Sequence, residues 1–277
     1  MMSDGKRSLD RPAKVLVYLF VVLAVLFLLV PIVGGIAMSF DARSFLGPFP
    51  PKHFSLRWYE RFFSDPIFMR ALRVSAILAV VATAISTCLG VAAAIALDRY
   101  RFGGREALLA LFLSPLIVPA VVVGFALLLF FSQIGIYDGF TRLIGAHIII
   151  IFPYTLRATL AGLVGINPRL TEAALSLGAN ERQAFRDVTL PLARTGIIAG
   201  AVMGFAFSFD EVAVSLFLVD PSSNTLPVAL VSMMRANFDL TVAAASTMLV
   251  AFTLVLILVL DRVVGLDRIV GQGVYRI

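Results

Sequence analysis

Long apolar stretches recur along this chain, separated by shorter segments that hold most of its charged residues. Each of six such stretches is long enough for a helix that crosses a bilayer, which takes about 20 residues. They cover residues 15–38, 69–97, 107–131, 143–164, 193–219 and 241–264. The pattern predicts an all-α integral membrane protein whose six transmembrane helices form one domain, 15–264, between terminal tails at 1–14 and 265–277.

The composition agrees with a chain that is mostly embedded in lipid. Of 277 residues, 60% are hydrophobic and 14% are charged, whereas soluble domains have roughly 45–50% apolar and about 25% charged residues. An ordinary soluble enzyme is therefore excluded. His53 and His147 are isolated from other metal-ligating residues, and we find no catalytic triad pattern or phosphate-binding loop. We expect this chain to be non-catalytic and to bind neither a metal nor a cofactor.

The net charge of +6 predicts an orientation in the membrane. No basic run with interleaved aromatic residues is present, so binding to nucleic acid is not expected. Basic residues instead gather in segments 6–14, 99–105, 169–194 and 262–276. These segments all lie on one side of a six-helix chain, and an excess of Lys and Arg marks the cytoplasmic side. Both termini are therefore predicted to be cytoplasmic. The first apolar run exceeds the about 7–15 residues of a signal peptide, which favours an uncleaved helix.

Small residues and aromatic residues predict two local features. A stripe with four-residue spacing lies along one face of the fifth predicted helix, where it would allow close helix packing in lipid. It consists of Gly196, Gly200, Gly204 and Ser208. In the outer segment 40–68, Trp58, Tyr59, Phe62 and Phe63 suit a helix that lies at headgroup level, and docking of an external protein is the alternative.

The segment 165–191 has too much helical patterning for a simple connector. Asn167 and Pro168 predict the start of a short helix, and Gly178 predicts its end. Asn180 and Gln183 predict the start of a second short helix, which we expect Leu190 and Pro191 to end before the next span. The two helices expose an apolar stripe with a charged rim, which suits a protein partner, the bilayer surface or the chain's own bundle.

The letters EAALSLGANERQAFRDVTLP in this segment resemble the EAA loop of permease subunits of ABC importers. The spacing matches at Glu172, Ala173, Ala174, Gly178 and Leu190-Pro191, whereas Val188 stands where the pattern usually has Ile. From about 54 to 260 the chain also resembles the second permease of spermidine/putrescine importers, for example in LRWYERFF and RYRFGG. The resemblance implies a type I (MetI-like) importer permease bundle in a bacterial inner membrane.

This resemblance implies partners and a coupling role for the loop. The partners would be a second permease subunit, two ATPase subunits that hold ATP and Mg, an external substrate-binding protein and membrane lipid. A different chain is favoured as the second permease. The loop would fit a cleft on the ATPase. The residues implied in this coupling are Glu172, Ala173, Ala174, Leu177, Gly178, Phe185, Val188, Leu190 and Pro191.

Two carboxylates within the fifth apolar run are candidates for the substrate path. Placing the charged side chains of Asp210 and Glu211 inside a membrane is unfavourable in free energy, so both residues are functional candidates by default. They would replace water around a cationic substrate, and Phe207 and Phe209 would add aromatic faces. A structural or gating role for the pair is the alternative. The resemblance favours polyamines as substrate, with opines, other amines, thiamine or iron as alternatives. A self-contained channel or secondary transporter is the alternative for the whole protein.

Overall fold

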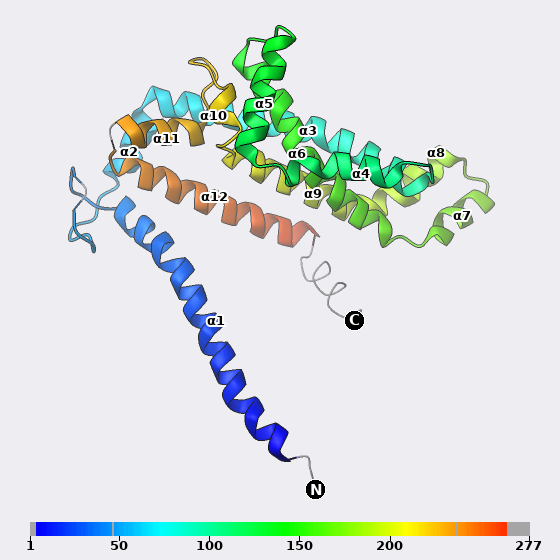
Figure 1. Cartoon of the computed structure of the whole chain (residues 1–277), viewed down its shortest axis with the longest axis horizontal. Coiled ribbons are helices and arrows are strands. Elements are labelled where there is room, and N and C mark those ends of the chain that lie inside the picture. The colour runs from blue at the N-terminus through cyan, green and yellow to red at the C-terminus, as the bar shows by residue number, and fades with distance from the viewer. Residues whose placement is uncertain (1–3, 46, 237, 265–277) are drawn as a thin grey trace. The chain divides into compact units, whose positions relative to one another are not determined.

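The computed structural model describes residues 4–264, except positions 46 and 237, and these residues are almost wholly helical (Figure 1). The predicted tail at 265–277 lies outside them. The α-helices are α1 (Asp4–Ser39), α2 (Arg57–Ser64), α3 (Pro66–Arg99), α4 (Arg105–Leu113), α5 (Ala120–Gln133), α6 (Gly139–Val164), α7 (Pro168–Ser176), α8 (Glu181–Ala184), α9 (Leu190–Asp210), α10 (Ser215–Leu218), α11 (Leu226–Ala236) and α12 (Thr241–Val264).

Five of the described helices are long and apolar enough to cross a membrane, and α4 with α5 makes a sixth crossing if this bent pair counts as one. The prediction of an all-α membrane protein is confirmed. Because α1 begins at Asp4, the described part of the predicted tail 1–14 is helical rather than separate from the first span.

The first of two compact units comprises Met1–Ser64 and Met233–Met248. In this unit the α2 side chains of Trp58 and Phe62 are buried, and Trp58 packs against the start of α12. The Trp58 indole N–H donates to the backbone oxygen of Asp41 at 2.7 Å. Trp58 and Phe62 therefore pack inside the protein rather than facing outward, and the placement of α2 at headgroup level stays a prediction.

The second unit comprises Asp65–Ser232 and Leu249–Ile277. Its centre consists of α3, α6 and α9, which pack side by side (Figure 1). Leu78 of α3 and Leu143 and Ile151 of α6 are fully buried there. The hydroxyl of Thr155 on α6 donates to the backbone oxygen of Ser86 on α3 at 3.1 Å, which fixes these two helices against each other.

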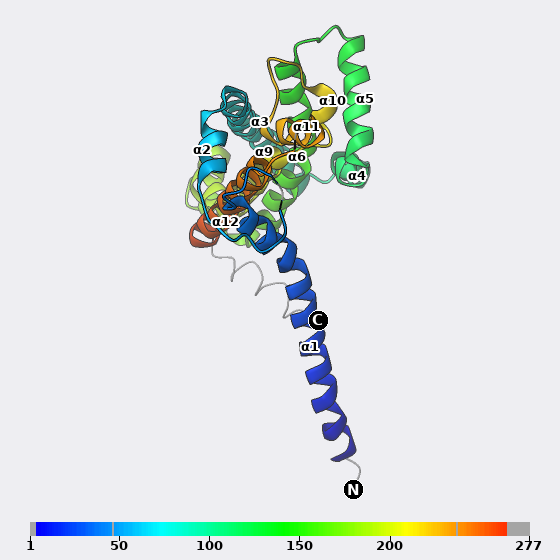
Figure 2. The same cartoon turned by 90° about the vertical axis from the view of Figure 1, so that its left-hand side faces the viewer.

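The third predicted span, 107–131, is not one continuous helix. It is broken between α4 and α5, and the two pieces are bent by 102° (Figures 1 and 2). A single 3₁₀ turn, Ser114–Leu116, follows α4, and Pro119 precedes the first residue of α5. Pro115 lacks the backbone N–H that would continue the hydrogen bonds of α4, and Pro119 is the N-cap of α5, so one proline lies where the first helix ends and the other where the second begins.

The fifth predicted span, 193–219, differs at both ends. Upstream, α8 continues into α9 through a π-helical turn at Phe185–Thr189, so the helix does not stop at Leu190 and Pro191 as expected. The N–H of Leu190 donates to the oxygen of Phe185, five residues back, and this wider turn carries the helix to the first turn of α9, where Pro191 needs no partner for its nitrogen. Downstream, α9 ends at Asp210.

Candidate functional site

The segment between α6 and α9 forms the two short helices that its sequence predicts. Asn167 caps α7, and its side-chain oxygen accepts the Arg169 N–H at 3.1 Å. Gly178 has φ +93°, a conformation that side-chain-bearing residues rarely adopt, and it lets the chain turn from α7 to α8. Asn180 and Gln183 form a reciprocal capping box with distances of 2.9 and 2.8 Å. The turn between the helices is therefore well specified.

This loop presents much of its surface to the outside. No residue of α7 is buried, and Leu177 is 90% exposed. Six of the predicted coupling residues are exposed and three are partly buried. The exposed ones are Glu172, Ala173, Leu177, Gly178, Leu190 and Pro191, and the partly buried ones are Ala174, Phe185 and Val188. An apolar side chain as exposed as Leu177 on a structured turn is typical of a docking surface.

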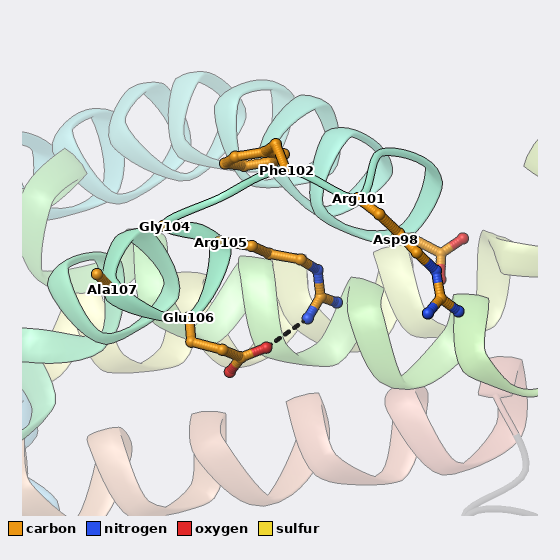
Figure 3. Close-up of a pocket in the computed structure, with 7 residues that line it drawn as sticks. All are labelled: Asp98, Arg101, Phe102, Gly104, Arg105, Glu106 and Ala107. Carbon is orange, nitrogen blue, oxygen red and sulfur yellow. Dashed lines mark hydrogen bonds and ion pairs between the residues drawn. The ribbon is translucent and has the colours of Figure 1, made fainter.

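An ion pair and a pocket adjoin the loop. Arg99, the last residue of α3, pairs with Glu181 of α8 at 3.1 Å. Just beyond Arg99, the turn from α3 to α4 lines a pocket, in which Arg105 donates to the backbone oxygen of Leu97 at 2.8 Å and to Glu106 at 2.6 Å (Figure 3). The turn between α3 and α4 and the α7–α8 loop thus lie at the same end of the second unit.

The small-residue stripe of α9 faces α6. A Cβ atom at Gly196 would lie 2.5 Å from the backbone oxygen of Ala158. At Gly200 it would lie 3.0 Å from the Cα atom of Thr155, and the Cβ of Gly204 would have ordinary contacts. The stripe therefore lies where the α6 and α9 backbones approach each other closely, and Ser208 continues it.

The aromatic residues near the end of α9 point to different neighbours. Phe209 is buried, and its ring centroid lies 5.0 Å from that of Phe252 on α12. The ring centroid of Phe207 lies 4.8 Å from that of Tyr154 on α6, and Phe207 is 38% exposed. Asp210 is exposed as well, and residues three apart on a helix share a face. Within the described residues, Phe207 and Asp210 thus form an open face of α9, whereas Phe209 belongs to the core.

Glu211 is committed to local hydrogen bonds. Its backbone is extended, its side chain is buried, and its carboxylate accepts the N–H groups of Val214 and Ser215 at 2.8 and 2.9 Å. It also accepts the Ser215 hydroxyl at 2.9 Å. These donors lie at the N-cap and the first residue of α10, and they would otherwise be unpaired in an apolar environment. The geometry gives Glu211 a structural role and leaves Asp210 as the open carboxylate.

The partners of His147, a histidine that is isolated in the sequence, were not predicted. In the structure His147 is completely buried on α6, with its two ring nitrogens close to the hydroxyls of Ser208 and Ser215. The available signal was its place inside the apolar run 143–164, because a polar ring in a membrane helix needs partners.

A family model for the inner membrane component of binding-protein-dependent transport systems matches residues 86–266. The chain belongs to this family. The matched region includes the α7–α8 loop and α9, and it makes the protein a permease component rather than a self-contained channel. Membership in this family confirms the resemblance that the loop indicates, and a multi-pass membrane location follows from the family together with the apolar helices.

Curated relatives cover most of the permease. It is 33% identical over 233 residues to the spermidine/putrescine transport system permease protein PotC of Haemophilus influenzae, which covers 84% of this chain and 89% of that protein. It is 29% identical over 203 residues to the putrescine transport system permease protein PotI of Escherichia coli, and this match covers 71% of this chain and 72% of that protein. These relatives span both compact units.

Solved structures show the same fold. A chain of a bacterial alginate ABC transporter, in complex with a periplasmic protein that binds an alginate pentasaccharide, has a TM-score of 0.72 over 93% of this chain and 95% of its own, at 18% identity. A chain of the MetNI methionine ABC transporter has a TM-score of 0.60 over 72% and 94%, at 19% identity. At such low identity the likeness concerns the fold alone.

Proposed function

We propose that this permease imports polyamines as the membrane subunit of an ATP-driven, binding-protein-dependent transporter in a bacterial inner membrane. The family model supports the transporter class, and the similarity to PotC over 89% of that protein's length supports the substrate class. The partners are an external binding protein, two ATPase subunits and a second permease subunit, a different but homologous chain.

The α7–α8 loop is the element that couples this permease to its ATPase. This coupling role is supported by the exposed face around Glu172 and Ala173, together with the exposed Leu177 at the turn. Ala173 lets a partner approach closely, and Glu172 offers a carboxylate to basic or amide groups. ATP and Mg are bound by the ATPase, and this chain holds no cofactor of its own. Movement of the loop is passed to α9 directly, because α8, the π-turn and α9 form one continuous helix.

Asp210 is the group that meets the cationic substrate. The observation that carries this role is the contrast between two neighbouring carboxylates, since Glu211 is buried and fully hydrogen-bonded whereas Asp210 is exposed. A carboxylate facing the path replaces part of the water around an ammonium group, and the exposed ring of Phe207 adds a cation–π contact on the same face.

Uptake by proteoliposomes tests this function. The complete transporter is reconstituted with its binding protein, and import of labelled putrescine and spermidine is measured together with ATP hydrolysis. Asp210→Asn keeps the size of the side chain but removes its charge. It should lower uptake about 10- to 100-fold, because the free energy of one hydrogen bond to a charged group corresponds to a factor of that size. Asp98→Asn, in the last turn of α3, is the matched control and should import normally.

Three results would contradict parts of the proposal. Import of another solute class, such as ferric iron or thiamine, but not polyamines would replace the substrate and keep the machine. Normal uptake by Asp210→Asn would make this residue structural. Uptake without ATP or without the ATPase subunits would favour a secondary transporter and overturn the importer class.

A further inference from the structure

The helix break between α9 and α10 occurs inside the apolar end of the fifth span. Helix α9 ends at Asp210, α10 begins at Ser215, and the intervening residues make no regular helix. Unpaired backbone groups at such a break are costly in lipid, where water is not available to bond them. Glu211 accepts the N–H groups of Val214, the N-cap of α10, and Ser215, its first residue, so the break depends on how this one carboxylate is held.

The imidazole of His147 bridges the two sides of this break. Ser208, in the last turn of α9, has its Oγ atom 2.7 Å from the Nδ1 atom of His147. Ser215, the first residue of α10, has its Oγ atom 3.0 Å from the Nε2 atom. The bridging ring comes from a third helix, α6, which is itself bonded to α3 through Thr155. His147 thus ties both sides of the break to the fixed centre of the unit.

The hydrogen bonds run in one direction through the four side chains. A serine hydroxyl has one proton, and Ser215 donates its proton to the carboxylate of Glu211. Ser215 must therefore accept from His147, which places the ring proton on Nε2. In the neutral imidazole Nδ1 then accepts the proton of Ser208. Every donor in the chain Ser208, His147, Ser215, Glu211 is used, and a fully satisfied buried network of this kind holds its members rigidly.

We propose that His147 is a positioning residue of the substrate path, which acts through Ser215 and Glu211 to fix the place of Asp210. Asp210 lies between Ser208, bonded to one ring nitrogen, and Glu211, bonded through Ser215 to the other. Loss of the ring leaves both sides of the break free to move, and the carboxylate of Asp210 moves with them. This role rests on the proposed function of Asp210 as the group that meets substrate.

Hydrogen exchange tests the positioning itself, without any substrate. His147→Leu fills a similar space without polar atoms, whereas the amide of His147→Gln retains a donor near the Nε2 position. In the complete transporter in detergent, His147→Leu should speed exchange of the Val214 and Ser215 amides about tenfold, and His147→Gln should remain within about twofold of the wild type. Ser215→Ala, which cuts the same chain, should resemble His147→Leu. Ser232→Ala is the control, because among the described residues that hydroxyl bonds to the Val228 oxygen in its own helix.

Transport tests whether His147 acts through Asp210. Putrescine imported per ATP hydrolysed should fall about tenfold in His147→Leu and recover in His147→Gln, while complexes assemble normally. The double variant His147→Leu with Asp210→Asn should be no worse than Asp210→Asn alone, because residues that act as one unit are not additive. Multiplying effects, or unchanged amide exchange in both His147→Leu and Ser215→Ala, would overturn the proposal. A wild-type complex that imports neither putrescine nor spermidine would instead overturn the proposed substrate, and amide exchange would still decide the positioning role.

Discussion

At the scale of single residues, glycine 196 sets how closely α6 and α9 approach. Its Cβ in Gly196→Ala would meet backbone atoms, with 2.5 Å to the Ala158 oxygen and 2.9 Å to the Gly162 Cα, and backbone cannot move aside as a flexible side chain can. We expect a loss of about 1–3 kcal/mol in stability from this overpacking. Thermal unfolding in detergent measures it. Among the described residues, nothing lies within 4 Å of the Cβ atom that Gly103→Ala adds, so this variant should unfold like the wild type. Equal stability of both variants would contradict the close approach.

The hydrogen bonds of Asp220 make the stability of the folded protein depend on pH. Its carboxylate accepts hydrogen bonds from the hydroxyls of Ser222 and Ser223 at 2.7 and 2.8 Å and from the Gly139 N–H at 2.9 Å, and these bonds hold the pKa of Asp220 well below its usual 3.8. A lowered pKa adds stability that is present above the ordinary pKa and is lost as pH falls through the lower, folded-state value. Asp220→Asn should therefore unfold at a lower temperature at pH 7 and lose less stability on acidification below about 4.

Thermal unfolding of wild type and Asp220→Asn across pH 3–7 measures this difference. Parallel curves for the two proteins would show that Asp220 does not tie the loop after α10 to the start of α6.

Single residues also show what a sequence can predict. The spacing of the stripe is readable because a glycine, or the serine at position 208, recurs every four residues on one helix face. The partners of His147 are not readable, because Ser208 and Ser215 lie 61 and 68 residues further along the chain. Glu211 and Asp210 are adjacent in sequence, and only the fold separates a buried cap from an exposed carboxylate.

At the scale of elements, local chemistry predicts where helices start and bend. The caps at Asn167 and Asn180 and the left-handed Gly178 depend on neighbouring residues only, and the structure has all three. The continuity of α8 with α9 was not predicted, because a π-turn needs no special residue and Pro191 suggested a stop. Pro115 and Pro119 indicate a kink in the third apolar run, but the break into α4 and α5 was not predicted, since prolines occur in both kinked and broken helices.

The turn between α7 and α8 gives an element-scale prediction. Gly178→Ala puts a side chain at φ +93°, which costs about 1–2 kcal/mol and disfavours the observed angle between the two helices. If the loop is the coupling element, putrescine uptake per ATP hydrolysed should fall severalfold while the protein still inserts into the membrane. Gly165→Ala is a matched control in the same loop, since the added Cβ atom would lie 4.0 Å from the backbone oxygen of Gly162 and would not clash with it. Unchanged uptake by both Gly178→Ala and Glu172→Ala would contradict the coupling role.

At the scale of the whole molecule, apolar run length predicts the class of protein but not the path of the chain. Six runs were predicted, and the described helices include five spans plus the bent pair α4–α5. Whether a span stays continuous or breaks depends on burial, because a helix that packs on others tolerates breaks that an isolated span in lipid does not. The packing of α3, α6 and α9 depends on contacts between residues far apart in the chain, which hydrophobic periodicity does not specify.

The orientation of the permease gives the last prediction. Tyr137 comes just before the start of α6, whereas Leu177 follows its other end and lies on the loop whose Glu181 pairs with Arg99. A helix of 26 residues is about 39 Å long, enough to place its ends on opposite sides of a bilayer. The basic residues around Leu177 and the α3–α4 turn predict that this end is cytoplasmic.

Cysteine labelling of intact cells decides the orientation. Cys88 is the chain's single cysteine and is first replaced by serine. An impermeant maleimide should then label Tyr137→Cys from outside, but Gly103→Cys and Leu177→Cys only after the cells are opened. Using two inner positions guards against an ATPase that covers Leu177. The reverse pattern would invert the protein in the membrane and place the α7–α8 loop outside the cell, where no ATPase could reach it.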